Sequence, residues 1–130
     1  MKSRDHVVRL KRFQVEERRR RVQQIEAMIA EFHRMATDLD REIANEETRS
    51  GISDPAHFAY PTYARAAATR RDNLKRSADE LKEQATEARL NLDVAMEDFR
   101  KAESLEGREK TSERVAPKTV PDFPFGLASA

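Results

Sequence analysis

The fold is decided by residues 22–43, VQQIEAMIAEFHRMATDLDREI. Apolar side chains recur there every seven residues at one position and at a second position in between. The two series are Val22, Ile29, Ala36 and Ile43, and Ile25, Phe32 and Leu39. Such alternating spacing places the side chains on one stripe of an α-helix and is typical of a coiled coil. The stripe extends back through Val15 to Val8, so we expect a helix over residues 4–50 that packs along another helix.

A second apolar stripe with the same spacing follows later in the chain. It consists of Leu74, Ala78, Leu81, Ala85, Ala88, Leu92, Ala95, Phe99 and Ala102. Two helices joined by a short connection are expected to be antiparallel neighbours. A single register then sets the stripes against each other, with Ile25 opposite Ala88 and Val15 opposite Phe99. The sequence therefore predicts an all-α fold, a long antiparallel two-helix coiled-coil hairpin whose second helix spans residues 62–115.

The connection, residues 51–61, contains one glycine and two prolines. Gly51 suits the left-handed cap that commonly ends an α-helix, with Ile52 folding back as its apolar contact. Residues 53–60 open with Ser-Asp-Pro, which offers an N-cap and a proline in a first turn, so we expect a short helix there. Thr62 is then expected to cap the second long helix.

Residues 116–130 differ in character from the helical part, because three prolines fall within them. Proline interrupts a helix, so we expect a flexible, disordered tail after a single domain of residues 1–115. Phe123, Phe125 and Leu127 suggest a short binding peptide as the alternative. The general behaviour of chain termini favours the disordered end with incidental aromatic residues.

Composition excludes several classes of protein. Charged residues make up 38% and aromatic residues 6%, which leaves little material for a globular core. Lys and Arg number 25 against 24 Asp and Glu, so the whole molecule has no marked attraction to nucleic acid or membranes. There is no Cys and no membrane-length apolar run, and the first ten positions include charged residues where a signal peptide would be apolar. We expect a soluble cytosolic protein.

Catalytic and metal chemistry find no support in the sequence. His6, His33 and His57 are scattered, and no helical pair has the spacing of metal ligands. There is no phosphate-binding glycine loop and no nucleophile with a plausible base, and a two-helix hairpin lacks a water-excluding cavity. We therefore expect no enzyme, cofactor, metal or small-molecule substrate.

The N-terminal part of the first helix is basic. This part includes four consecutive arginines, namely Arg18, Arg19, Arg20 and Arg21. A solvated helix face explains most of this run, because consecutive side chains point around the helix axis. In the expected register, acids of the second helix lie near this end and neutralise part of it, namely Glu97, Asp98, Glu103 and Glu106. As a binding surface, the run favours a protein partner over nucleic acid, because aromatic stacking residues are missing from it.

Apolar residues outside the stripes form two candidate contact sites. Leu10 and Phe13 occupy outward positions beside the basic residues, and either a docking surface or local drift of the supercoil explains them equally well. Phe58, Tyr60 and Tyr63 gather around the connection. A small plug that seals the end of the hairpin is the favoured interpretation, and a partner-binding tip is the alternative.

Four segments of the chain resemble the FliJ family of flagellar export proteins, in its alphaproteobacterial form. They are MKSRD at residues 1–5, LKRF at 10–13, QIEAMI at 24–29 and, above all, GISDPAHFAY at 51–60. The resemblance extends from residue 1 to about residue 105. Its heptads are unspecific, whereas the loop sequence is distinctive, and the Pro-rich tail departs from the charged helical C-terminus of the family.

The resemblance implies a coiled-coil component of the flagellar type III export apparatus, similar to the central stalk of rotary ATPases. The implied partners are the hexameric export ATPase, the cytoplasmic part of the membrane export gate and export chaperones, at the cytoplasmic side of the inner membrane. The family has no catalytic residues. Combined with the residue pattern, it assigns Leu10, Phe13 and Arg18–Arg21 to the ATPase and the aromatic tip to the gate. The alternative is a nucleic-acid-binding or scaffolding coiled coil that self-associates.

Overall fold

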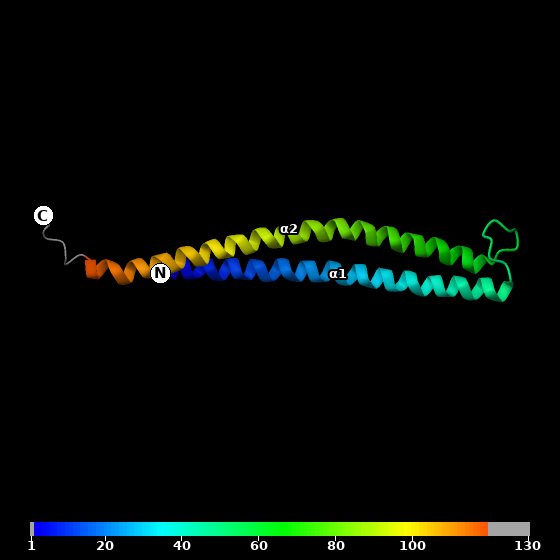
Figure 1. Cartoon of the computed structure of the whole chain (residues 1–130), viewed down its shortest axis with the longest axis horizontal. Coiled ribbons are helices and arrows are strands. Elements are labelled where there is room, and N and C mark those ends of the chain that lie inside the picture. Colours follow the sequence, from blue (N-terminus) through cyan, green and yellow to red (C-terminus); the bar gives the residue numbers. More distant parts are fainter. Residues whose placement is uncertain (1, 120–130) are drawn as a thin grey trace. The chain divides into compact units, whose positions relative to one another are not determined.

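The computed structural model describes residues 2–119, with side chains over residues 4–108 and at Thr111. It contains two α-helices, α1 (Lys2–Ser50) and α2 (Thr62–Thr119), and no strand among the described residues (Figure 1). The predicted all-α helical hairpin is confirmed. Over the same residues, neither helix has an apolar stretch that would cross a lipid bilayer.

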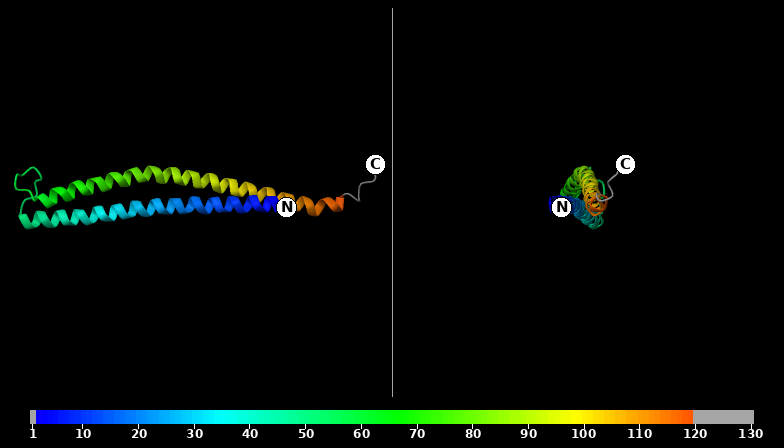
Figure 2. Two further views of the ribbon diagram at one scale, coloured as in Figure 1. Left: turned by 180° about the vertical axis from the view of Figure 1, so that it is seen from behind. Right: turned by 90° about the vertical axis from the view of Figure 1, so that its left-hand side faces the viewer.

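The chain divides into two compact units, each with a stretch of both helices. Unit 1 comprises residues 1–19 and 90–130, and unit 2 comprises residues 20–89. In each unit the stretch of α1 runs antiparallel beside the stretch of α2, as Figures 1 and 2 show from different sides. Each unit therefore has its own seam, the apolar interface between the two helices.

The predicted stripes form the seam of unit 2. Ile25 is its most deeply buried large side chain, with 1% of its surface exposed. On α2 the buried positions are mainly alanines, namely Ala64, Ala67, Ala78, Ala85 and Ala88. Small side chains let helix axes approach closely, because the bulky residues of one helix fit against the backbone of the other. An ion pair between Glu26 and Arg89 joins the helices beside Ile25 and Ala88, in agreement with the predicted register.

The seam of unit 1 follows the same pattern. Val8 and Val15 are buried on α1, and Ala95 and Ala102 are buried on α2. Val15 also lines one groove together with Phe99, the residue predicted to lie opposite it. The predicted register is therefore confirmed within unit 1 as well.

A compact apolar cluster closes the loop end of unit 2. Its buried members are Leu39, Ile43, Tyr60, Ala64 and Ala67, and Ile52, Ala68 and Leu74 pack against them. The apolar spacing of α2 thus continues from Leu74 back through Ala67 and Ala64 to Tyr60. The sequence contained this extension, but the predicted stripe began only at Leu74.

Arg71 occupies one position of this extended stripe and remains charged. Its guanidinium donates to Asp40 Oδ1 across the helices at 3.0 Å and to Asp72 Oδ1 at 3.1 Å. The hydrogen bond to Asp40 raises the pKa of Arg71, while partial burial acts in the opposite direction. Partly exposed ion pairs typically contribute only about 0–1 kcal/mol. The apolar seam therefore remains the main source of stability.

The end of α1 confirms the predicted glycine cap. Gly51 has a φ angle of 75°, and its N–H donates to the carbonyl oxygen of Glu47 at 2.9 Å. This is the left-handed cap that glycine adopts without steric cost. Ile52 then packs against the loop cluster, as expected, and its N–H donates to the Ser50 hydroxyl at 3.1 Å.

Residues 53–60 form turns, so the predicted short helix there is wrong. Asp54 accepts hydrogen bonds from the N–H of Ala56 through its carboxylate, at 2.9 Å, and from the N–H of His57 through its carbonyl, at 3.0 Å. A second turn follows, in which the N–H of Tyr60 donates to the carbonyl of His57 at 3.0 Å. These local bonds satisfy the backbone without a helix, because an Asp side chain readily forms a turn of its own.

The bounds of α2 differ slightly from the prediction. The carbonyl of Pro61 accepts the first helical bond, from the N–H of Arg65 at 3.1 Å, so Pro61 stands at the N-cap and Thr62 is the first helical residue. The helix continues to Thr119, beyond the expected end at residue 115. Pro117 lies within this last part, where a proline forfeits the hydrogen bond of its own nitrogen. Residues 120–130 of the predicted disordered tail lie outside the described residues.

Truncation of Ile25 tests the seam. We expect Ile25→Ala to lower the free energy of unfolding by about 2–4 kcal/mol, because the alanine of the facing helix cannot fill the cavity that is left. Met28→Ala is the matched control, since Met28 is 45% exposed on the same helix and should change stability much less. Urea unfolding followed by circular dichroism measures both variants. Equal losses for the two would contradict the assignment of Ile25 to the seam.

Candidate functional site

Three exposed apolar residues follow one another along α1 in unit 1. Val7, Leu10 and Phe13 are 40%, 51% and 56% exposed, and we call them the N-terminal apolar strip. Their spacing of three residues keeps neighbours on adjoining parts of the helix surface. Local drift of the supercoil would have drawn Leu10 and Phe13 into the seam, and the structure instead leaves them exposed. The strip is therefore accessible to a partner.

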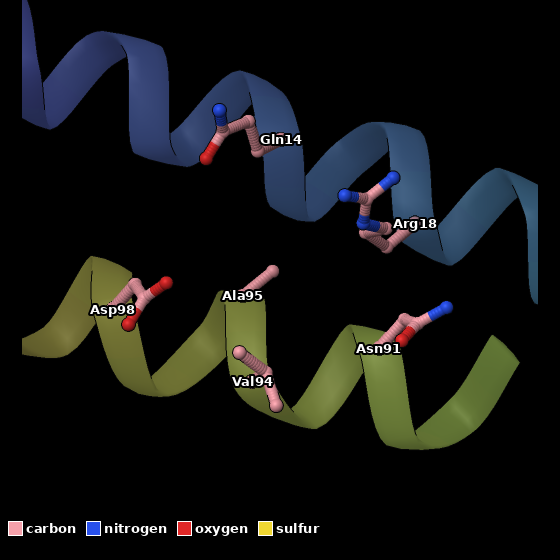
Figure 3. A pocket seen from close by; sticks show the side chains of 6 residues that line it. All are labelled: Gln14, Arg18, Asn91, Val94, Ala95 and Asp98. Carbon is pink, nitrogen blue, oxygen red and sulfur yellow. The ribbon is translucent and has the colours of Figure 1, made fainter. Parts of the chain in front are cut away.

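The arginine run begins at a weak point of the seam in unit 1. Arg18 and Arg19 are exposed on α1, as are Arg20 and Arg21 in the adjoining residues of unit 2. Arg18 and Gln14 face the stretch of α2 that bears Asn91, Val94, Ala95 and Asp98, and the six residues line a recess of about 130 Å³ (Figure 3). Ala95 leaves room opposite Arg18, so an arginine takes a seam position without being buried.

A larger groove of about 320 Å³ borders the same stretch of α1 and lies further toward the C-terminus of α2. Apolar side chains of Val15, Met96 and Phe99 contribute to its lining, together with Arg12, Glu16, Arg19, Arg100 and Glu103. The guanidinium of Arg12 lies over the Phe99 ring, 5.5 Å from its centre. Such cation–π contacts stabilise by about 0.5–1 kcal/mol at exposed sites. Sequence reasoning missed the role of Arg12, which depends on Phe99 across the seam.

Two of the acids predicted to offset the basic residues lie beside them. Asp98 lines the recess beside Arg18, and Glu103 lines the groove with Arg12. Glu97 instead forms an ion pair with Arg100 of its own helix, at 2.9 Å. Acids of α2 thus lie beside basic residues of α1 at both openings of unit 1.

Tyr60 is a core residue, so its assignment to a partner-binding surface is wrong. Its ring is 5% exposed within the loop cluster, and its hydroxyl donates to Glu47 Oε2 at 2.7 Å. The guanidinium of Arg65 lies over the ring, 5.3 Å from its centre, and donates to the carbonyl of Pro55 at 3.0 Å. The favoured interpretation, a small plug at the loop end, therefore applies to Tyr60. Its contacts hold the loop against both helices of unit 2.

Tyr63 lies at the edge of the same region and is half exposed. Its hydroxyl donates to the carboxylate of Glu42 on α1. This hydrogen bond raises the pKa of Tyr63, and the bond to Glu47 raises the pKa of Tyr60, because each carboxylate favours the neutral, donating phenol. Tyr63 thus connects the helices through its tip while part of its ring remains accessible.

Phe58 is the one predicted tip residue that is fully presented to solvent. Its side chain is 95% exposed, and its ring stacks on His57 with 4.9 Å between the ring centres. The Nδ1 atom of His57 accepts a hydrogen bond from the N–H of Ala59 at 2.9 Å, which fixes the turn that bears Phe58. Among Phe58, Tyr60 and Tyr63, the sequence did not reveal which would be buried.

The described residues contain no cluster of three or more His, Asp or Glu placed to hold a metal ion. The recess and the groove are small openings along the seam and are lined by arginine and acidic side chains rather than by a nucleophile with a base. No protein-family model, curated protein or solved structure matches the chain. The arrangement is suited to contact with other macromolecules through exposed aromatic, aliphatic and arginine side chains.

The pH dependence of stability tests the Tyr60 hydrogen bond. The pKa of Tyr60 is raised in the folded state. The hydrogen bond of its hydroxyl therefore adds to the free energy of unfolding below pH ~10, and this addition is lost as pH rises through the folded-state pKa. Tyr60→Phe should therefore lower the thermal midpoint at neutral pH, and its difference from the unmodified protein should shrink as pH rises through the raised folded-state pKa.

Phe58→Leu is the control for this measurement, since it changes an exposed ring with no ionisable group. Its thermal midpoint should differ from that of the unmodified protein by the same small amount across this pH range. A Tyr60→Phe difference that stays constant with pH would show that the hydroxyl does not stabilise the fold in this way.

Proposed function

We propose that the protein is a non-enzymatic coiled-coil stalk of the flagellar type III protein export apparatus. In this role it couples the hexameric export ATPase to the cytoplasmic part of the membrane export gate, on the cytoplasmic side of the inner membrane. The antiparallel helical hairpin is consistent with the role, and the loop sequence of residues 51–60 resembles the FliJ family. Export chaperones are further partners in the proposal, without an assigned surface.

The exposure of Leu10 and Phe13 beside the arginines is the observation on which the ATPase contact depends. Both side chains are more than half exposed, and Arg18 and Arg19 are exposed in the same unit. Binding energy in protein interfaces concentrates in apolar and arginine side chains that become desolvated. Surface charges around such a centre mainly increase the association rate and select the partner. In the proposal, Leu10 and Phe13 anchor the contact and the arginines orient it.

The loop of unit 2 supplies the second proposed contact. The turns of residues 54–60 fix the backbone that presents Phe58, so less backbone freedom is lost on binding, and its ring stacks on His57. Tyr63 offers the exposed part of its ring beside the loop. In the proposal, these two aromatic side chains meet the export gate, and Tyr60 holds the loop to the helices from within the cluster.

Charge reversal tests the ATPase contact. We expect replacement of Arg18–Arg21 by Glu to weaken capture of the hexameric ATPase about tenfold or more, because attraction becomes repulsion. Leu10→Ala with Phe13→Ala should weaken it to a similar extent through loss of the anchors. Pull-down with purified ATPase at several salt concentrations measures both effects.

Two control variants accompany this experiment. Replacement of Arg18–Arg21 by Lys retains the charge and should largely retain binding, and Met28→Ala removes an exposed apolar side chain from unit 2. Circular dichroism confirms that each variant is helical. Unchanged capture by the Glu variant would remove the ATPase assignment.

Motility tests the loop contact. We expect Phe58→Ala with Tyr63→Ala to reduce swimming and secretion of flagellar proteins at normal levels of the variant. The fold should persist, because Phe58 is 95% exposed and Tyr63 is half exposed. Met28→Ala, another exposed apolar truncation, is the control and should swim normally. Normal swimming of the double variant would count against the gate contact.

A self-associating scaffold remains the second candidate function. Leu90 and Val94 lie one helical turn apart on α2 and are 60% and 61% exposed. Such a pair favours packing against a further helix, as in helical bundles. Light scattering of the isolated protein distinguishes a dimer or larger bundle from the monomeric stalk of the first proposal.

A further inference from the structure

The two openings of unit 1 mark the two flanks of its seam. With the seam residues at heptad positions a and d, the lining of the recess includes g positions and that of the groove includes e positions. The g residues are Gln14, Asn91 and Asp98, and the e residues are Arg12, Arg19, Met96 and Glu103. Positions e and g flank an a/d seam on opposite sides. We call these sides the recess flank and the groove flank.

The recess flank carries exposed apolar side chains from both helices. A residue seven positions away lies on the same flank, because the pattern repeats every seven residues. Val7 precedes Gln14 by seven residues, and Leu105 follows Asp98 by seven. Leu10 lies one helical turn before Gln14. Val7, Leu10 and Leu105 are 40%, 51% and 40% exposed, so all three belong to an accessible part of this flank.

Leu105 extends the N-terminal apolar strip onto α2. Val15 and Phe99 line the same groove, and the helices run antiparallel in unit 1. Six residues on from this pair, Leu105 is therefore about level with residue 9, between Val7 and Leu10. We call the N-terminal apolar strip and Leu105 together the extended strip.

Basic side chains border the extended strip on the same flank. Lys101 and Arg108 follow Val94, which lines the recess, by seven and fourteen residues. Lys11 precedes Arg18, which also lines the recess, by seven. Lys101 and Arg108 are exposed, and Lys11 is half-buried. By the register of unit 1, Lys101 is about level with residue 13 and Arg108 with residue 6, so the two stand at opposite ends of the strip.

The acidic side chains at these levels lie elsewhere. Glu103 lines the groove, and Asp5 precedes the groove residue Arg12 by seven positions, so both belong to the groove flank. Glu106 follows Phe99 by seven residues and therefore occupies a seam position. Among the described residues, the recess flank beside the strip thus bears apolar and basic side chains and no acid. The net charge of +1 for the whole chain averages over this segregation.

This combination fits the surface of a lipid bilayer that contains anionic lipids. Exposed Leu and Phe side chains enter the boundary between headgroups and acyl chains, while Lys and Arg reach the phosphates. The stems of Lys and Arg can lie along apolar material with their charges at the headgroups. A protein helix would instead anchor its side chains in a groove, and no member of the extended strip lines the recess or the groove.

We propose that the extended strip is a docking site for the surface of an anionic lipid bilayer, with Lys101 and Arg108 on the headgroup phosphates. The contact is peripheral and needs no membrane-spanning helix. It ends where acids first appear on the recess flank, at Asp98 and Glu17. The inference goes beyond the proposed export function, because its ligand is lipid. Leu10 and Phe13 cannot serve the bilayer and the ATPase at once, so the two ligands compete for them.

Flotation of the full chain with vesicles tests the docking site. We expect binding to vesicles of equal parts phosphatidylglycerol and phosphatidylcholine, and little binding to phosphatidylcholine alone. Lys101→Glu with Arg108→Glu should weaken binding about tenfold or more, because each basic residue near an anionic surface contributes to affinity. Arg12→Glu with Arg100→Glu is the matched control, since it makes the same change of charge on the groove flank and should weaken binding much less.

A fluorescent probe on the otherwise unmodified chain shows which flank meets the lipid. The chain has no natural cysteine, so Leu105→Cys and Glu103→Cys each provide one attachment site for an environment-sensitive dye. We expect emission to shift to shorter wavelength on the anionic vesicles for the dye at position 105 and to stay nearly unchanged at position 103. This measurement does not depend on the charge variants being folded.

Three outcomes would overturn the docking site. Equal binding to both kinds of vesicle would remove the role of anionic lipid. Equal weakening by the two charge variants, or equal shifts at the two dye positions, would mean a general attraction without an oriented contact. A Lys101→Glu, Arg108→Glu chain that binds vesicles normally but loses capture of the ATPase would assign the strip to a protein partner. The vesicles contain no export protein, so failure here leaves the stalk proposal to its own tests.

Discussion

Packing of branched side chains of α1 against alanines of α2 is the interaction on which each unit depends. Ile25 is almost completely buried, and the facing buried positions of α2 are mainly alanine. Burial of an Ile side chain stabilises by about 1.5–3 kcal/mol, which exceeds the contribution of a partly exposed ion pair. Glu26, Arg89, Asp40 and Arg71 therefore align helices that the apolar seam already holds together.

The helices and their register could be predicted because each depends on a repeated local pattern. Every apolar residue assigned to the two stripes is buried or half buried in the structure. The cap at Gly51 was equally accessible to prediction, since few residues other than glycine adopt its conformation readily. The turns of residues 53–60 were not predicted, because a Ser-Asp-Pro start suits both a turn and a helix, and long-range packing of Tyr60 decides between them.

The candidate contact residues were predictable in type but not in exposure. Phe58 and Tyr60 are two residues apart and both aromatic, yet one is exposed and the other is buried. The difference arises because Tyr60 contacts two residues outside the loop. Glu47 lies on α1, and Arg65 lies on α2. The contact between Arg12 and Phe99 escaped prediction for the same reason. The exposure of Leu10 and Phe13 was easier to predict, because their heptad positions point away from the seam.

The connection through residues 51–61 has a consequence for how the seam behaves in a cell. Both halves of the coiled coil belong to one polypeptide, so they meet at the effective concentration set by a short tether rather than at the concentration of the protein. Their pairing is thus insensitive to dilution, unlike that of a coiled coil assembled from separate chains. The two helices therefore stay paired, and their outer surfaces stay available to a partner, even when the protein is present at very low concentration.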